Sequence, residues 1–164
     1  MGITSKDNGY ASLVKKVFDL SKQHPVIKVG ILAKDGDKPH GDDALTVLQI
    51  AVFNEFGTSK IPERSFIRAW FDANEGVIKE RLTALMRSVV KEKRTPGDIL
   101  EILGGWCVGQ IQARISQGIT PGNAESTLRK KAPKTTPLID TGVLRASVSY
   151  RVEGLSSTKE GGAK

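Results

Sequence analysis

The sequence has 164 residues, of which 38% are hydrophobic and 26% charged, and its formal net charge is +7. This balance is typical of one soluble globular domain and excludes wholesale disorder. The apolar runs are too short to cross a bilayer and the N-terminus lacks the apolar segment of a signal peptide, so neither membrane insertion nor export is expected. The single cysteine, Cys107, cannot form an internal disulfide; its apolar neighbours predict a buried structural thiol in a reducing compartment such as the cytosol.

The N-terminal part of the chain predicts one helix, one strand and one exposed loop. Residues 10–20 place large apolar side chains on one helical stripe, and the pair His24-Pro25 ends this helix because a residue before proline avoids helical geometry. Residues 26–33 read VIKVGILA, which is typical of a strand. Residues 34–43 lack both the pattern of a calcium loop and a second histidine, so an exposed loop is favoured over a metal site.

Two helices are expected next. Asp42 or Asp43 can cap a helix over 44–56 by accepting hydrogen bonds from backbone N–H groups. This helix is apolar around most of its circumference, so we expect neighbouring elements to bury it on several sides. Gly57 stands where a left-handed residue ends a helix, and apolar residues at helical spacing predict a long amphipathic helix over 66–91.

The motif TPGD at 95–98 predicts the start of another long helix, with threonine as the cap, proline in the first turn and aspartate near the positive end of the helix dipole. Gly118 is expected to end this helix. Gly104 and Gly105 lie in its middle, where each glycine weakens it by about 1 kcal/mol relative to alanine. We expect this loss to be tolerated because another element packs closely against the two glycines.

The C-terminal part predicts an irregular segment followed by a strand. Residues 119–140 are basic and interrupted by prolines, with one turn of helix at 124–130. Residues 145–152 alternate apolar and polar side chains, which predicts a strand that pairs with 26–33. Residues 154–164 are expected to form a flexible tail.

Together these elements predict an α+β fold in a single domain over residues 1–153. A small antiparallel sheet is expected to pack against two long amphipathic helices, with long polar loops between the elements. The loops over 34–43 and 119–137 are long for such a domain, and we expect them to order or change shape when the protein meets its partners.

Patterns that carry chemistry are absent from the sequence. It contains no G-x-G-x-x-G motif, no phosphate-binding loop and no G-x-S-x-G nucleophile motif, and two histidines with one cysteine cannot supply a zinc site of usual spacing. Carboxylate pairs fall at helical spacings that are typical of solvated faces. We therefore expect no catalytic residue, no metal, no cofactor and no enzymatic activity.

The basic residues concentrate in two groups, KEKR at 91–94 and RKKAPK at 129–134. Neither group is interleaved with aromatic residues as a base-stacking surface would be. Solvated faces that keep the protein soluble explain these charges as well as binding does, and only weak, nonspecific contact with DNA is expected. The candidates for contact with phosphate or with an acidic partner are Arg129, Lys130, Lys131 and Lys134.

The stretch FNEFGTSKIPERSFIRAWFD, which begins at Phe53, concentrates aromatic side chains at a helix-to-loop junction. Phe53 and Phe71 are expected to fill the core of a helix–loop–helix corner. Charged residues beside aromatic anchors are also typical of protein–protein contacts. For Phe56, Arg64 and Arg68 the packing interpretation and the contact interpretation both stay open.

Two stretches, AVFNEFGTSKIPERSFIRAWFD at 51–72 and PLIDTGVLRASVSY at 137–150, give the chain a family resemblance. In this order it resembles the tail-completion or neck proteins of long-tailed bacteriophages, the tail-component family that includes minor tail protein Z-like members. The resemblance runs from about Val26 to Val152. Ser65 stands where the family usually has proline, which is expected to loosen the loop while leaving the phenylalanine anchor in place.

The resemblance implies an α+β structural subunit of the virion that forms a ring, commonly a hexamer, at the head-proximal end of the tail tube. Its partners would be further copies of itself, the tail tube protein and the head-side connector or stopper protein, in the virion neck after assembly in the host cytoplasm. No membrane partner is implied. Asp140, Thr141 and Gly142 would form the turn that aims Leu144 and the closing strand. The implied contact residues are Glu55, Phe56, Gly57, Thr58, Ile61, Pro62, Arg64, Phe66, Arg68, Asp140, Thr141, Gly142 and Leu144.

Two alternative functions stay open. One is a basic nucleic-acid-binding module, whose affinity for DNA would fall steeply with added salt. The other is a different position in the same phage machine, as a connector adaptor or stopper.

Overall fold

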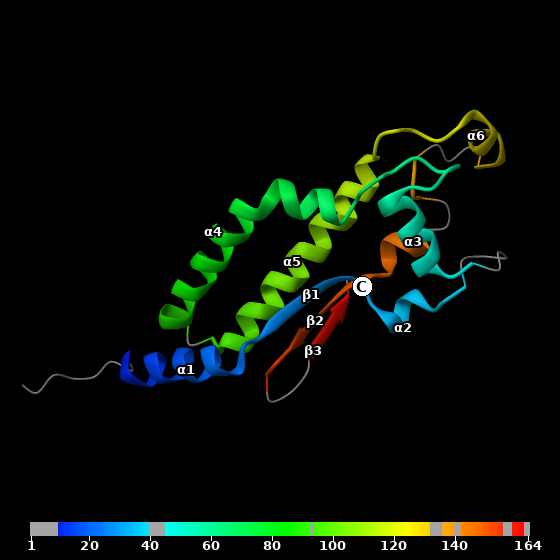
Figure 1. Ribbon diagram of the computed structural model, residues 1–164. Coiled ribbons are helices and arrows are strands. Elements are labelled where there is room, and N and C mark those ends of the chain that lie inside the picture. The colour runs from blue at the N-terminus through cyan, green and yellow to red at the C-terminus, as the bar shows by residue number, and fades with distance from the viewer. Residues whose placement is uncertain are drawn as a thin grey trace, which may run out of the picture.

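The computed structural model describes residues 10–39, 45–92, 94–131, 136–139, 142–155 and 159–162 (Figure 1). The predicted α+β class is confirmed, because a small antiparallel sheet lies against a hairpin of two long helices, α4 and α5. In chain order the elements are α1 (Tyr10–Gln23), β1 (Val26–Ile31), α2 (Ala33–Gly36), α3 (Val47–Phe56), α4 (Arg68–Glu92), α5 (Pro96–Gln117), α6 (Glu125–Lys131), α7 (Val143–Ala146), β2 (Val148–Glu153) and β3 (Lys159–Gly162).

The described strands form one antiparallel sheet in the order β1-β2-β3, so β2 is central. The predicted pairing of the first strand with the closing strand is confirmed, with Ile31 opposite Val148. β3 lies within the segment that the sequence predicts to be a flexible tail, and that prediction is wrong for residues 159–162. The strand reads KEGG and shows no apolar alternation; it pairs through its backbone, and Gly161 lets it approach the Tyr150 ring closely.

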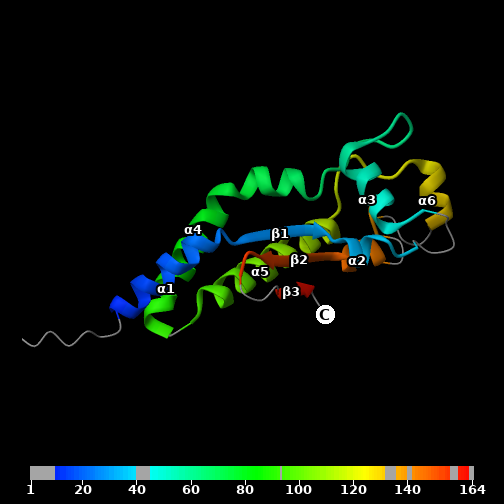
Figure 2. The same cartoon turned by 60° about the horizontal axis from the view of Figure 1, so that its bottom comes forward.

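The core lies between α5 and the sheet, and α4 runs beside α5 on the side of β1 (Figures 1 and 2). Leu103, Cys107 and Ile111 of α5 are buried in one cluster with Val148 of β2 and Trp70 of α4. The prediction of a buried thiol is thus confirmed. Burial raises the pKa of the Cys107 thiol to about 11, so the thiol stays protonated at neutral pH.

Close packing of α5 on the sheet depends on a glycine in the middle of the helix. A Cβ atom at Gly104 would lie 2.5 Å from Cδ2 of Tyr150, closer than real Cβ atoms come. A Cβ atom at Gly105 would lie 3.8 Å from Cε1 of the same ring, which is an ordinary contact. The expectation that another element packs closely against this pair is confirmed, and Gly104 is the residue that the packing requires.

The start of α5 follows the predicted motif. The Thr95 hydroxyl oxygen accepts a hydrogen bond from the Asp98 N–H at 3.2 Å, and the Asp98 carboxylate accepts one from the Thr95 N–H at 2.8 Å. This reciprocal capping box satisfies two of the unpaired donors at the helix start. Gly118, with a φ of 87°, ends the helix as predicted.

The start of α3 differs from the prediction. Thr46 is the N-cap, and Gln49 completes a capping box, so the helix begins at Val47. The physical reason is that the side chains of a threonine and of a glutamine three residues later accept hydrogen bonds from two backbone N–H groups at the helix start. The side chain of one aspartate cap satisfies fewer of these N–H groups. Asp42 and Asp43, the predicted caps, lie outside the described residues.

Short helices occupy segments that were predicted as loop or strand. α2 follows β1, so this strand ends at Ile31 instead of continuing to residue 33. α7 occupies residues predicted as strand, so β2 begins at Val148 instead of residue 145. The helix turn predicted at 124–130 is confirmed as α6, and α1 ends before His24-Pro25 as predicted.

The molecule is elongated, and its two ends carry different elements. α1 lies at one end, α3 and α6 lie at the other, and β1 runs between them (Figure 2). This separation follows from the topology, because β1 connects α1 to α2 and α3. The aromatic and charged stretch at 53–72 therefore lies at the α3 end.

Candidate functional site

The stretch at 53–72 forms the corner between α3 and α4, as the sequence predicts, and Gly57 ends α3. The φ of Gly57 is 72°, and a Cβ atom there would come within 3.0 Å of the Glu63 backbone nitrogen. Glycine therefore fits both the dihedral and the space. The Thr58 N–H donates to the Ile61 carbonyl oxygen at 2.7 Å, and the Thr58 hydroxyl oxygen accepts from the Ile61 N–H at 2.9 Å. These contacts fix the backbone of the turn.

Glu55 holds the start of α4 from inside the corner. Its carboxylate accepts hydrogen bonds from the backbone N–H groups of Phe66 at 2.9 Å, Ile67 at 3.1 Å and Arg68 at 2.8 Å, and from the Ser65 hydroxyl at 2.6 Å. Backbone N–H groups at the start of a helix have no partner within the helix, and the positive end of the helix dipole favours an anion. Glu55 of α3 is therefore a cap for α4.

The ionised form of Glu55 is the form that this network stabilises. The residue is 7% exposed, and burial alone would raise the pKa of its carboxyl group. The hydrogen bonds from Ser65 and from three backbone N–H groups outweigh this effect, so the pKa lies below its ordinary value. Glu55 is consequently a buried carboxylate whose two oxygens are occupied by donors of the same chain.

Ser65 tightens the corner, although its place in the phage resemblance predicts a looser loop. Its hydroxyl donates to Glu55 Oε1 and accepts from the Ala69 N–H at 2.9 Å. One hydroxyl group thus connects the carboxylate of α3 to the first turn of α4. Proline has no hydroxyl group and could form neither hydrogen bond.

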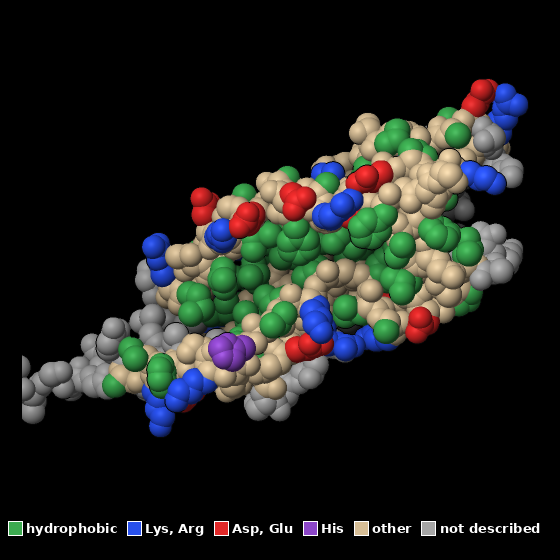
Figure 3. Space-filling view, viewed as in Figure 1, with side chains coloured by type: hydrophobic (Ala, Val, Ile, Leu, Met, Phe, Trp, Pro, Cys, Tyr) green, Lys and Arg blue, Asp and Glu red, His purple; other side chains and the backbone are tan. Residues whose placement is uncertain are grey.

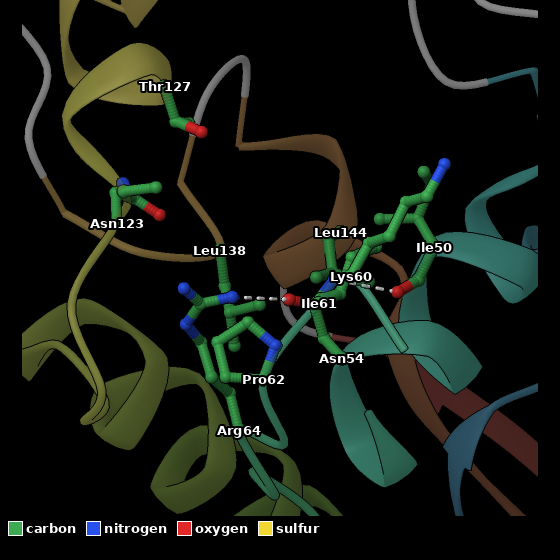
Figure 4. Close-up of a pocket in the computed structure, with 11 residues that line it drawn as sticks. Ile50, Asn54, Lys60, Ile61, Pro62, Arg64, Asn123, Thr127, Leu138 and Leu144 are labelled. Carbon is green, nitrogen blue, oxygen red and sulfur yellow. Dashed lines mark hydrogen bonds between the residues drawn. The ribbon is translucent and has the colours of Figure 1, made fainter. Parts of the chain in front are cut away.

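Arg64 fastens the corner to the segment after α5. Its Nε donates to the Pro121 carbonyl oxygen at 2.7 Å, and its Nη2 donates to the Gly122 carbonyl oxygen at 2.8 Å. Nη1 lies 3.4 Å from Asn54 Oδ1, and Figure 4 shows the guanidinium pointing toward this side chain. Arg64 is 7% exposed, so its hydrogen bonds support the packing interpretation.

A cavity of about 230 Å³ opens beside Arg64 (Figure 4). The second stretch of the phage resemblance reaches its wall through Leu138 and Leu144, so the two stretches meet in space at this corner. Asn54, which also lines the cavity, donates from Nδ2 to the Ile50 carbonyl oxygen at 2.8 Å and accepts from Arg64. The side chains of Asn54 and Arg64 therefore form hydrogen bonds with other groups of the same chain.

Several predicted contact residues lie inside the corner and not on its surface. Phe66 is 0% and Leu144 is 2% exposed, and both belong to the core. Gly142 is the N-cap of α7 with a φ of 84°, so it begins the short helix that carries Leu144 and leads to β2, as expected for a helix-start turn. The contacts that the structure shows for Phe66 and Leu144, like those of Glu55 and Arg64, are therefore structural ones within the corner, and a contact of these residues with a partner stays a prediction. Asp140 and Thr141 lie outside the described residues.

The outer face of α3 supplies the surface of the corner. Leu48, Val52 and Phe56 recur every four residues and are 40%, 43% and 61% exposed. The adjacent face of the helix, which carries Val47, Ala51 and Glu55, is buried. The prediction that neighbouring elements bury α3 on several sides is wrong for the face that carries Leu48, Val52 and Phe56, whereas other sides of α3 pack against α2 and α7.

These exposed side chains border a groove of about 290 Å³, whose opposite wall is formed by Ile31 at the end of β1 and Ile67 before α4. Arg68 lies at its rim. The Arg68 guanidinium is 5.0 Å from the centroid of the Phe56 ring, and its Nη2 lies 2.6 Å from Glu63 Oε1. We call this surface the α3 groove and define it by Ile31, Leu48, Val52, Phe56, Ile67 and Arg68; the buried residues Ala51, Glu55 and Phe66 also line it.

The α3 groove adjoins a larger apolar band. Figure 3 shows apolar side chains gathered between α4 and β1, from the middle of the molecule toward α3, with charged side chains along the rims. The elements β1 and α4 carry half-buried apolar residues that pack against the core, including Ile27, Val29, Ile31, Phe71, Ile78 and Leu82. The apolar surface near the corner therefore extends beyond the α3 groove.

The remaining predicted contact residues differ in their exposure to solvent. Thr58, Pro62 and Arg68 are exposed, whereas Gly57 and Ile61 are half-buried. Arg129 is exposed on α6 and forms an ion pair with Glu125. The side chains of Lys130 and Lys131, and the whole of Lys134, lie outside the described residues.

Sequence reasoning missed four residues of the groove, Ile31, Leu48, Val52 and Ile67. For Leu48 and Val52 the available signal was the four-residue spacing that places them on the same helix face as Phe56. That spacing was hidden because the other faces of the helix are apolar as well.

Over the described ranges, no three His, Cys, Asp or Glu side chains come together as a metal site. None of the helices in the same ranges is both long and apolar enough to span a bilayer. Comparison with protein-family models, curated proteins and solved structures finds no match to this chain.

Proposed function

We propose that this chain is a tail-completion subunit of a phage neck, a structural protein that forms a ring on the tail tube and joins the tube to the head-side connector. The observation that carries the proposal is the α3 groove. Large apolar side chains that stay exposed together mark protein–protein interaction sites, and three of them lie on one face of α3. A ring subunit needs such a surface because every copy must make the same contacts with its neighbours.

The construction of the corner supports this role. Glu55 and Arg64 join α3, the start of α4 and the backbone at 121–122 through buried and partly buried hydrogen bonds. A surface that is held in place before binding loses little conformational freedom on association, so more of the contact energy remains as affinity. The residues that carry the phage resemblance therefore divide into buried ones that shape the corner and exposed ones, such as Phe56, that are available to a partner.

The test is to remove this chain from the phage that encodes it. We expect electron microscopy of the lysate to show filled heads and complete tails that are not joined, and we expect added purified chain to restore joined particles. Joined and infectious particles formed without this chain would overturn the proposal.

A matched pair of variants connects this test to the α3 groove. Val52→Glu places a charge among the apolar side chains of the groove and is expected to abolish the rescue. Val77→Glu changes a valine of α4 that is 48% exposed, compared with 43% for Val52, and is expected to rescue normally. Rescue by both variants would show that the groove is not the contact surface, provided that circular dichroism shows both to be folded.

A further inference from the structure

A second exposed apolar stripe lies on α1, at the other end of the molecule. Val14 and Phe18 are four residues apart and are 48% and 57% exposed. Lys22, one further turn along, places its Nζ 4.4 Å from the centroid of the Phe18 ring. α1 thus repeats the pattern of α3, in which apolar residues four apart end in an aromatic ring covered by a cation, there Phe56 under Arg68.

We propose that α1 of one copy binds in the α3 groove of the next copy, so that the chain assembles head to tail. This inference rests on the proposed ring function and assigns the contact between its subunits. α1 and α3 lie at opposite ends of the molecule in both views, so the helix does not occupy the groove of its own chain (Figures 1 and 2). A contact between two different surfaces passes from copy to copy and closes into a ring when the rotation between copies allows it.

The two surfaces match in pattern, and α1 is long enough to cover the exposed face of α3. At 1.5 Å per residue, the 14 residues of α1 span about 21 Å and the 10 residues of α3 span about 15 Å. An amphipathic helix binds a groove through anchors spaced three or four residues apart, which is the spacing of Val14 and Phe18. Phe18, the more exposed of the two, is the anchor for the space between Val52 and Ile67.

The charges at the two surfaces also match. Asp19 is exposed next to Phe18 on α1, and Arg68 rims the groove with half of its side chain exposed. Lys22 on α1 and Glu63 beside Arg68 supply a second pair of opposite charges. Asp19 facing Arg68 and Lys22 facing Glu63 would fix the direction in which α1 lies, because complementary charges select one orientation of a contact.

Disulfide trapping between purified full-length variants tests this contact. Phe18→Cys is mixed in turn with Leu48→Cys, Val52→Cys or Phe56→Cys, because a disulfide forms only when two Cα atoms come within about 7 Å of each other. We expect a two-chain product from at least one of these mixtures. We expect each variant oxidised alone, and the mixture of Phe18→Cys with Val77→Cys of α4, to stay at background.

The outcomes separate the proposed contact from other contacts. Equal yield from Phe18→Cys alone or from one α3 variant alone would show a symmetric contact and overturn the proposal. Equal yield with Val77→Cys, or no product in any mixture, would overturn it as well. The unmodified chain, whose Cys107 is buried, sets the background.

Self-association measured by sedimentation gives a second readout that does not depend on disulfide geometry. Phe18→Ser and Val52→Ser are each expected to raise the concentration for association about tenfold or more, because each removes a large apolar side chain from the contact. Val77→Ser is expected to leave association unchanged. A chain that stays monomeric at every soluble concentration, or one on which all three variants act equally, contradicts the proposal.

Failure of this inference can be distinguished from failure of the phage function. If heads and tails join only with this chain but the cysteine pairs give no product, the ring contact lies elsewhere and only the inference fails. If the disulfide forms but particles join without the chain, head-to-tail assembly stands and the phage function fails.

Discussion

Replacing Glu55 with glutamine perturbs the corner at a single point while keeping the shape of the side chain. Oε2 of Glu55 accepts from the N–H groups of Phe66 and Ile67, and Oε1 accepts from the Ser65 hydroxyl and the Arg68 N–H. Glutamine has one acceptor oxygen and one NH₂ donor, so two of the four donors lose their acceptor. The negative charge at the start of α4 is lost as well.

The magnitude follows from these contacts. A hydrogen bond to a charged group contributes about 1.5–3 kcal/mol, and bonds within one network are not additive. We therefore expect Glu55→Gln to lower the free energy of unfolding by about 3 kcal/mol. For a domain of this size, such a loss lowers the melting temperature by about 6–12 °C.

Thermal and chemical denaturation followed by circular dichroism measure this loss, and Glu63→Gln is the matched control. Glu63 is a neighbouring glutamate whose side chain is 55% exposed and pairs with Arg68 at the surface. Exposed ion pairs contribute about 0–1 kcal/mol, so Glu63→Gln is expected to change stability by less than about 1 kcal/mol. Equal and small losses for the two variants would refute the assignment of Glu55 as the α4 cap.

The same assignment predicts a pH dependence with a definite sign. The pKa of Glu55 in the folded chain lies below its ordinary value of 4.5, so its contribution is complete above that value and is lost as pH falls through the folded pKa. The stability difference between the unmodified chain and Glu55→Gln should therefore shrink as the pH is lowered below 4.5. A difference that stays constant until acid unfolding would contradict the reasoning.

Three further predictions concern the core. Gly104→Ala should lower the free energy of unfolding by about 1–3 kcal/mol because the new Cβ atom would lie 2.5 Å from Tyr150. A Cβ atom at Gly109 would have no atom within 4 Å, so Gly109→Ala should raise the free energy of unfolding by about 0.5–1 kcal/mol. Denaturant titrations in which both changes have the same sign would argue against this packing. Phe66→Ala should lower the free energy of unfolding by about 3–5 kcal/mol, and a loss below about 1 kcal/mol would mean that the ring is not packed as described. The Cys107 thiol, with a pKa of about 11, should resist alkylation at neutral pH in the folded chain and react in denaturant, so rapid labelling of the folded chain would contradict its burial.

Local patterns were sufficient to predict most of the fold. The capping box at Thr95 and Asp98, the apolar spacing of the long helices and the pairing of β1 with β2 each depend on residues close together in sequence or on simple alternation. The packing against Gly104 was predicted because glycine in a helix interior is unfavourable without a compensating contact. β3 was missed because its residues, Lys159 to Gly162, pair through backbone groups that every sequence has.

The corner could be located from the sequence, but the roles of its residues could not be assigned. Glu55 caps a helix that begins 13 residues later, and Arg64 bonds to carbonyl oxygens 57 and 58 residues away. No local pattern encodes such distant partners, so a buried cap and a surface charge look alike in sequence. The α3 groove was missed because residues such as Leu48 and Val52 are apolar, and an apolar residue in a helix is ordinarily expected to be buried.

A reconstruction of the purified phage particle by electron microscopy tests the central claim most directly, namely that the α3 groove joins neighbouring copies of this chain where head meets tail. We predict a ring of this chain at the head-proximal end of the tail tube, in which Val52 and Phe56 of each copy are covered by the next. The chain found at any other place in the particle, or a ring whose α3 grooves all face solvent, would contradict the account.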